Sequence, residues 1–519
     1  MSRNARAAGM VMGGLGGLSP STSEGEIVEM LAAYARAGIR SFLFPGAFAR
    51  HPEKLSFLVA AARRATEAAR LGKALVAIGG NASSVFGLPF IPQIPTALGI
   101  ASSGSVGVAR RAGSFMGSQL AACGVDLVLG PRLDLASDPK DPVGALDGFG
   151  EDSRLAGRLG IAYARGLSRA GVAACVGRFP GLGVLCRDAN EGMAFIVLPV
   201  ERLERCEMRP FARAAAAGVA AVLVGRVLVP SLESERIPAS ASARVIEGRL
   251  RERLGFRGLV IGDDIEAEED PGKAALLGAL AGCDLCLFSR PEAAIAAAVS
   301  LEKAAAEGEL PAIRIEMARR RLEGLLRPRL NLFPPMPASK GSLRRAARDV
   351  ERGMGLLRGS LTLDASERGD FSRVLVLVFI PPEGAPDASE SSMVLSVIRA
   401  ELPGAEVLTL PADPRPGQAD KLDQALEPRD RFDEAVIFTY DAHFRPSQEG
   451  LARLVEESLP KFRVIAMRDP YDAAFFPKAV GLGAAYGFSE YCARAAARVV
   501  SGKAKARGGL PVEVIGLEV

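Results

Sequence analysis

The segment GRFPGLGVLCRDANEG, residues 177–192, brings several side chains that could do chemistry into one short, irregular stretch. It continues an apolar run that we predict to be a strand, and it carries Arg178, Asp188, Asn190 and Glu191 among glycines. Loops at the carboxyl ends of barrel strands commonly hold catalytic groups, so these residues are candidates for acid–base work or for binding a polar ligand. The segment contains no histidine, and the whole chain has only two.

The elements that would position this loop are apolar runs that alternate with helical patterns through the first two thirds of the chain. Eight runs are present: GMVMGGL (9–15), RSFLFPG (40–46), ALVAIGG (74–80), DLVLGP (126–131), AACVGRFPG (173–181), AAVLVGR (220–226), GLVIGDD (258–264) and CDLCLFS (283–289). Strands that alternate with helices form parallel sheets, and eight of them predict a (β/α)8 TIM barrel. Six glycines that precede runs are expected to end helices in the left-handed conformation: Gly38, Gly124, Gly171, Gly218, Gly255 and Gly282.

The alternation stops at RPRLNLFPPMPASKGS (327–342), which is rich in proline and basic residues and is predicted to be a linker, with one helix after it. A second series of strands and helices starts at RVLVLVFIP (373–381) and continues through AEVLTLP, EAVIFTY and FRVIAMRDP. We therefore expect a barrel over residues 1–330, a linker with its helix over 331–370, and a smaller three-layer α/β sandwich domain over 371–519.

Composition excludes several classes of function. The 64 Lys and Arg residues nearly balance the 60 Asp and Glu residues, and no basic run with interleaved aromatics occurs, so nucleic acid is not an expected partner. No stretch of about 18 uninterrupted apolar residues predicts a membrane span, and the start of the chain lacks the apolar core of a secretory signal. We expect a cytoplasmic protein with no membrane partner.

Cys283 and Cys286 have the spacing of a CxxC motif, but they lie within an apolar run that we predict to be a strand. Residues three apart in a strand point to opposite faces, so two buried thiols are expected rather than a metal or redox site. The sequence indicates no metal and no cofactor.

Several motifs, in this order along the chain, resemble glycoside hydrolase family three, and the bacterial β-N-acetylhexosaminidase branch of that family in particular. They are LFPGAFARHPEKL (43–55), IPTALGIA (94–101), GPRLDL (130–135), FGED (149–152), RFPGLG (178–183), PASAS (238–242), LRERLGFRGLVIGDDI (250–265) and GGLPVEV (508–514). The resemblance implies a retaining glycosidase in which an Asp nucleophile follows the seventh barrel strand. It also implies a carbohydrate, or another small polar molecule, as the ligand.

The family's nucleophile motif is a strand that ends in Ser/Thr-Asp-Asp, and this chain has Gly262-Asp263-Asp264 in its place. The resemblance therefore implies Asp263 as the nucleophile that would form a glycosyl-enzyme intermediate. Asp264, and Asp134 of the GPRLDL motif, are then candidates for substrate binding. Paired acids at this place could instead only cap the next helix.

The family loop after strand five reads Lys-His-Phe-Pro-Gly-His-Gly, then four residues, then Asp-Ser-His. This chain keeps the frame and Asp188, but the proton-transfer His is replaced by Asn190, which has no titratable proton. Gly177 and Arg178 stand where the family has the Lys and His that hold sugar hydroxyls, and Arg226 falls where another His follows strand six. The resemblance therefore implies an impaired active site.

Three interpretations stay open at this point. The protein is an active hydrolase in which Glu191 or Asp188 supplies the acid, with Asp188 depending on desolvation to raise its pKa. Alternatively, it is a non-catalytic relative in which Arg178, Asn190 and Arg226 bind a glycan or an anion, unless the arginines only form ion pairs with the acids. A third interpretation is a scaffold protein whose two domains serve as surfaces.

Overall fold

The computed structural model describes residues 6–79, 95–136, 139, 144–183, 186–187, 193–263, 270–327, 340–385, 387–428 and 430–514. The chain divides into two compact units. The barrel unit comprises Met1–Pro89, Ala109–Leu135 and Asp152–Pro337, and the sandwich unit comprises Phe90–Val108, Ala136–Glu151 and Ala338–Val519. These units are discontinuous in sequence, and the simpler boundaries near residues 330 and 370 stay a prediction.

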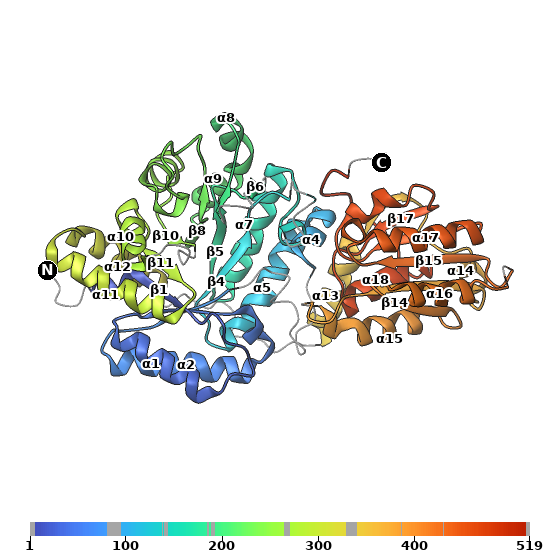
Figure 1. Ribbon diagram of the computed structural model, residues 1–519, viewed down its shortest axis with the longest axis horizontal. Helices are drawn as coiled ribbons and strands as arrows, with labels where there is room; N and C mark the ends of the chain where they lie inside the picture. Colours follow the sequence, from blue (N-terminus) through green and yellow to red (C-terminus); the bar gives the residue numbers. More distant parts are fainter. Residues whose placement is uncertain are drawn as a thin grey trace. The chain divides into compact units, whose positions relative to one another are not determined.

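Eight parallel strands close into a barrel in the order β1-β11-β10-β8-β5-β4-β3-β2 (Figure 1). Their bounds are β1 Val11–Gly14, β2 Ser41–Phe44, β3 Leu75–Ile78, β4 Leu127–Arg132, β5 Ala173–Phe179, β8 Ala221–Val224, β10 Leu259–Gly262 and β11 Leu285–Phe288. Each strand lies on one of the eight apolar runs, so the predicted (β/α)8 barrel is confirmed.

Helices follow the strands and surround them (Figure 1). They are α1 Glu24–Arg36, α2 Pro52–Ala68, α5 Val106–Ala122, α7 Ser153–Arg169, α8 Val200–Arg202, α9 Arg209–Ala216, the π-helical Arg244–Arg253, α10 Pro271–Ala281, α11 Pro291–Glu307 and α12 Ala312–Leu326. All six glycines predicted to end helices have φ between 69° and 115°. A residue with a Cβ is strained in that conformation, which is why glycine stands there.

The interior of the barrel is filled by strand side chains, and α12 closes one of its ends. Leu322, Leu325 and Leu326 of α12 pack into the same cluster as the inward-facing Met12 and Leu127. The end that α12 closes is the amino end of the strands, because Arg321 of α12 donates at 2.9 Å to Asp284, which directly precedes β11. The loops at the opposite, carboxyl end are therefore the ones that can form an active site.

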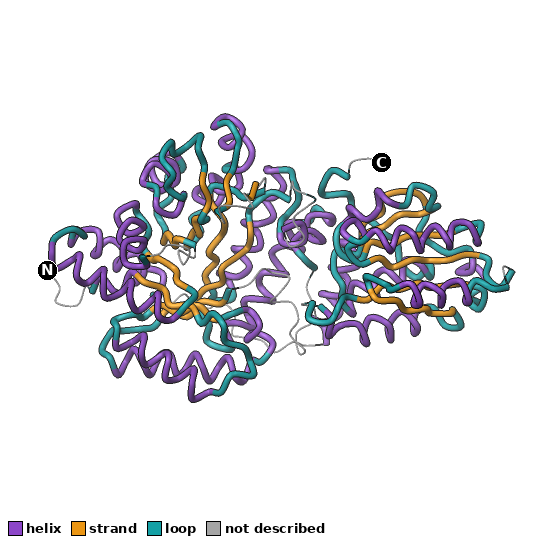
Figure 2. Tube along the Cα trace, in the orientation of Figure 1, coloured by secondary structure: helices purple, strands orange, loops and turns teal. Residues whose placement is uncertain are grey.

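The sandwich unit contains a six-stranded sheet with helices on both of its faces (Figure 2), which confirms the predicted α/β sandwich. The strand order is β12 Gly355–Gly359, β17 Gly481–Ala484, β16 Phe462–Ala466, β15 Glu434–Thr439, β13 Val374–Ile380 and β14 Glu406–Pro411. Its helices are α4 Ala97–Ser103, α6 Gly144–Asp147, α13 Lys340–Gly353, α14 Ala365–Arg368, α15 Ser391–Glu401, α16 Pro416–Ala425, α17 Pro446–Ser458 and α18 Glu490–Val500. The four strands β13–β16 coincide with the four predicted runs.

Strands β12 and β17 were not predicted, because their sequences GLLRG and GLGA are short and glycine-rich. They pair antiparallel to each other at one edge of an otherwise parallel sheet. Glycine is required there by close packing: a Cβ on Gly481 would lie 2.1 Å from the Ser360 carbonyl oxygen, and one on Gly355 would lie 2.6 Å from the Tyr486 hydroxyl. A sequence pattern based on apolar alternation does not detect such strands.

Candidate active site

Asp263 lies at the carboxyl end of the barrel, immediately after β10. Its backbone amide donates to the carbonyl of Val224, the last residue of the neighbouring β8, at 2.8 Å, which fixes where the chain leaves the sheet. The side chain is 21% exposed, so its carboxylate is accessible to a small ligand. Burial, together with the negative charge of Asp263, raises the pKa of the Cys175 thiol inside the barrel.

Arg178 lies beside this carboxylate. It is the second-last residue of β5, and its Nη1 is 3.4 Å from Asp263 Oδ2. The guanidinium is 37% exposed, so the ion pair stands in partly aqueous surroundings and contributes little to stability. The Arg178 side chain nevertheless places a permanent cation next to the carboxylate and occupies space there.

Asp134 is buried and holds the β5 loop in place. Its Oδ1 accepts hydrogen bonds from the backbone amides of Arg178 at 3.0 Å and Leu182 at 2.9 Å, and its Oδ2 accepts one from Arg132 Nε at 2.7 Å. Leu182 stands where the family loop has its second His, and it is buried. These hydrogen bonds give Asp134 a role in positioning the loop, and substrate binding by Asp134 stays a prediction.

Replacement of Asp134 by Ala is expected to destabilise the barrel by about 3–5 kcal/mol, because two backbone amides lose their buried acceptor and the half-buried Arg132 guanidinium loses its ion pair with Asp134. Urea unfolding followed by circular dichroism measures the change. Glu292→Ala, which removes an exposed carboxylate from the first turn of α11, is the control and should cost less than about 1 kcal/mol. Equal effects of the two substitutions would show that Asp134 does not hold the loop.

Arg226 lies two residues beyond the end of β8, at the same end of the barrel, and is half-buried. The chain then forms β9 Val227–Leu228, which pairs with β7 Ala194–Phe195, and β7 pairs in turn with β6 Cys186–Arg187. This small sheet was not predicted. It joins the segment after β5 to the segment after β8, and so brings two loops of the predicted site together.

Four of the predicted site residues lie outside the described residues: Asp188, Asn190, Glu191 and Asp264. The structure therefore brings Asp263 and Arg178 into contact and places Asp134 and Arg226 at the same end of the barrel. The distance between the Asp188 and Asp263 carboxyl groups, which would distinguish a retaining pair from an inverting pair, stays a prediction.

Cys283 and Cys286 are both buried, as predicted, but Cys283 precedes β11, so the expectation that the two thiols point to opposite faces of one strand is wrong. The Cys283 thiol donates to the Ser240 carbonyl at 3.2 Å, whereas that of Cys286 donates to the Ala275 carbonyl at 3.6 Å. The hydrogen bond with the Cys286 side chain, followed by burial, raises the pKa of the Cys283 thiol. Within the described part of the chain, the one group of side chains that could hold a metal ion lies elsewhere.

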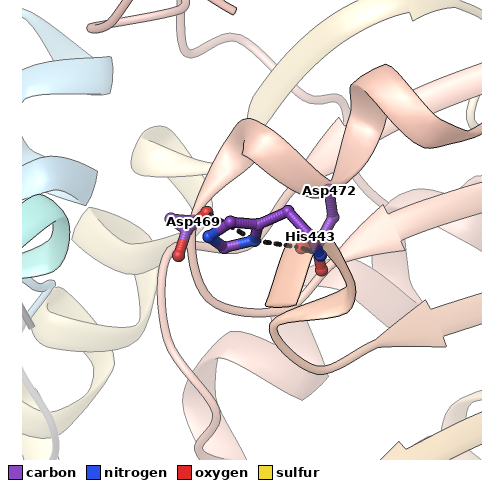
Figure 3. Close-up of side chains that lie close together, drawn as sticks. All are labelled: His443, Asp469 and Asp472. Carbon is purple, nitrogen blue, oxygen red and sulfur yellow. Dashed lines mark hydrogen bonds and ion pairs between the residues drawn. The ribbon is translucent and has the colours of Figure 1, made fainter. Parts of the chain in front are cut away.

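That group, in the sandwich unit, was missed by the sequence analysis. His443, Asp469 and Asp472 come together beyond the carboxyl ends of β15 and β16 (Figure 3). Burial raises the pKa of Asp469 well above its ordinary range, and burial likewise raises that of nearby Asp441 to about 6. Burial opposes protonation of His443, but the hydrogen bond to Asp472 and the surrounding carboxylates leave its pKa raised. Polar residues after two adjacent parallel strands were the available signal, in TYDAHF and MRDPYD.

In the part of the chain that the structure describes, no helix combines the length and apolar character needed to cross a membrane.

Comparison with known proteins identifies the family. The model of the glycosyl hydrolase family 3 N terminal domain matches residues 13–325, which is more than half of the chain. The β-hexosaminidase of Xylella fastidiosa (strain 9a5c) is 36% identical over 183 residues, which are 34% of this chain and 53% of the relative. The β-hexosaminidase of Bordetella pertussis is 33% identical over 192 residues, which are 36% of this chain and 54% of the relative.

The match thus spans about half the length of these curated relatives. A solved structure covers more: the glycoside hydrolase family 3 β-N-acetylglucosaminidase from Paenibacillus sp. is 25% identical, has a TM-score of 0.87, and aligns over 100% of both chains. The barrel, the sandwich and the family match agree, and the chain belongs to glycosyl hydrolase family 3.

Proposed function

We propose that the barrel carries a degenerate active site of β-N-acetylhexosaminidase ancestry, in which hydrolysis of ordinary N-acetylglucosaminides is strongly impaired or absent. The observation that carries this proposal is the ion pair between Arg178 and Asp263. Asp263 stands at the end of a barrel strand, where a nucleophile is expected, but its partner is a permanent cation.

Retention of Asp263 alone does not make an efficient glycosidase. Retaining hydrolysis needs a second group that protonates the leaving oxygen and then activates water. Asn190 stands where the family has its His, and an amide cannot exchange a proton in this way. Positioned acid–base catalysis is commonly worth about 10²–10⁴ in rate, so its loss leaves at best a slow enzyme.

The proposed ligand is a carbohydrate or another small polar molecule at the carboxyl end of the barrel. A second candidate function is binding of such a ligand without hydrolysis, and the exposure of Arg178 favours it. A guanidinium that is 37% exposed beside a carboxylate can still donate to a carboxylate or phosphate group of a ligand.

Replacement of Arg178 by His tests the proposal, because it restores the residue type of the family loop and removes the ion pair. We expect kcat/KM for an activated aryl N-acetylglucosaminide to rise about 5–13-fold, since one recovered hydrogen bond to a sugar hydroxyl is worth about 1–1.5 kcal/mol. Steady-state kinetics of the wild type and the variant measure this change in kcat/KM.

Arg158→His is the matched control, because Arg158 is exposed on α7, and it should leave the rate unchanged. A fall in rate with Arg178→His would contradict the proposal, because it would show that Arg178 assists catalysis instead of blocking it.

A further inference from the structure

The cluster of His443, Asp469 and Asp472 in the sandwich unit has no role in the function proposed above. His443 lies in the helical turn Ala442–Phe444 after β15, whereas Asp469 and Asp472 follow β16. β15 and β16 are adjacent and parallel, so their carboxyl ends bring the three side chains together. One potential metal-binding atom from each residue lies within 4.8 Å of those of the other two.

Asp472 fixes the orientation of the imidazole ring. Its Oδ1 is 2.7 Å from His443 Nδ1 and 3.0 Å from the His443 backbone nitrogen, which donates to it. Its Oδ2 accepts the hydroxyl of Thr439, the last residue of β15, at 2.5 Å. In the neutral ring, a carboxylate in this position holds the proton on Nδ1 and leaves the lone pair on Nε2.

Nε2 is therefore the nitrogen that can bind a ligand. The His443 side chain is only 7% exposed, and Nε2 is buried without a hydrogen-bond partner among the described residues. Figure 3 shows the ring lying between the carboxyl groups of Asp469 and Asp472. A buried polar atom without a partner is costly, and it is rare in native structures unless an ordered water or a bound ion completes it.

Asp469 supplies a second atom that could bind a metal ion. Its side chain is 2% exposed, and its Oδ1 is 3.6 Å from His443 Nδ1. It accepts a hydrogen bond from the Tyr471 backbone amide at 3.2 Å, which leaves further lone pairs on the carboxylate. Carboxylate oxygen and imidazole nitrogen together are the ligands of Zn²⁺ and related first-row divalent ions.

Charge around the cluster is unbalanced. Asp441 and Asp387 add two more carboxylates, and both pair with the same guanidinium, Arg468, at 3.1 and 3.2 Å. One arginine and one imidazole therefore face four acidic side chains, of which Asp469 and Asp472 are almost fully buried. Buried carboxyl groups are costly unless they are protonated, paired or bound to a metal ion, and a divalent cation would supply such a partner.

We propose that the cluster binds a divalent first-row metal ion of the Zn²⁺ class, with His443 and Asp469 as ligands and Asp472 as the residue that positions the imidazole. All three residues of the proposed site belong to the sandwich unit. The proposal therefore does not depend on whether the barrel hydrolyses glycosides.

Isothermal titration with Zn²⁺ tests the proposal on full-length protein that has been stripped with a chelator. We expect one ion to bind per chain with a Kd in the micromolar range or tighter. Asp469→Asn and His443→Ala should each weaken binding at least tenfold, and Asp472→Asn should weaken it about 10–100-fold. The visible absorption spectrum of bound Co²⁺ provides a second measurement of metal binding at the same site.

His51→Ala is the matched control, because His51 is the other histidine of the chain and is exposed. It should leave the Kd unchanged. Asp469→Asn keeps the pair of His443 and Asp472 intact, so it tests ligand binding even if His443→Ala unfolds the domain, which circular dichroism would show. Absence of a bound ion in the wild type, or binding that survives Asp469→Asn and His443→Ala undiminished, would overturn the proposal.

Discussion

Hydrolysis of aryl N-acetylglucosaminides by the purified protein is expected to fall by about 10²–10⁴ from the most acidic phenol leaving group to the least acidic one. A dinitrophenolate departs without protonation, so the first step then needs only the Asp263 carboxylate. Phenol itself needs an acid, and Asn190 cannot act as one. The expected pattern is a steep dependence of kcat/KM on leaving-group acidity.

The measurement is kcat/KM for dinitrophenyl, nitrophenyl and phenyl N-acetylglucosaminides with the wild type and Asp263→Ala. Loss of all cleavage in Asp263→Ala would assign the wild-type activity to this carboxylate. If the base for the second step is also missing, azide should accelerate turnover of the best substrate, because it attacks the glycosyl-enzyme without deprotonation.

A flat dependence on the leaving group would contradict this expectation, because it would mean that another side chain supplies the proton. Glu191 and Asp188 are the two candidates in the loop after β5. Glu191→Gln and Asp188→Asn would then identify the acid, since only the substitution that removes it should make the dependence steep.

Cleavage of none of these substrates would favour the binding function over the catalytic one. Thermal-shift screening against amino sugars, sugar phosphates and sugar acids would then identify the ligand class. Stabilisation by anionic sugars that disappears in an Arg178→Ala variant would assign recognition to the guanidinium beside Asp263.

The barrel could be predicted almost completely because its signals are local. Every strand is a short apolar run, and glycines such as Gly38 and Gly282 mark helix ends with a positive φ. β12 and β17 escaped prediction because close backbone packing, and not apolar side chains, defines them. That packing depends on residues more than a hundred positions apart in sequence, such as Gly481 and Ser360.

For the barrel site, the sequence predicted which residues take part and which strand each of them follows, but not which side chains touch. The position of Asp263 followed from the motif, but its pairing with Arg178 was one of several open arrangements, because strand order alone does not fix side-chain contacts. Asp134 shows the same limit, since its bonds to the amides of Arg178 and Leu182 join segments about 45 residues apart. His443 could not be assigned to a site from the sequence, because its partners come from a different strand end.

We expect a second large effect on a natural type of substrate, a disaccharide whose leaving group is a sugar hydroxyl. A sugar hydroxyl is a far poorer leaving group than any phenol in the series, so its departure depends fully on the missing acid. The replaced binding residues at positions 177, 178 and 226 remove further interactions, each worth about 1–3 kcal/mol when charged. Both losses act on the same transition state, and hydrolysis should drop below detection.

The most direct measurement is therefore release of N-acetylglucosamine from its β-linked disaccharide by purified wild-type protein and by Asp263→Ala. A related β-N-acetylglucosaminidase of the family serves as the positive control for the assay. The account predicts that the wild type releases no more sugar than Asp263→Ala does. Robust release by the wild type that is abolished by Asp263→Ala would contradict it and establish a working hydrolase.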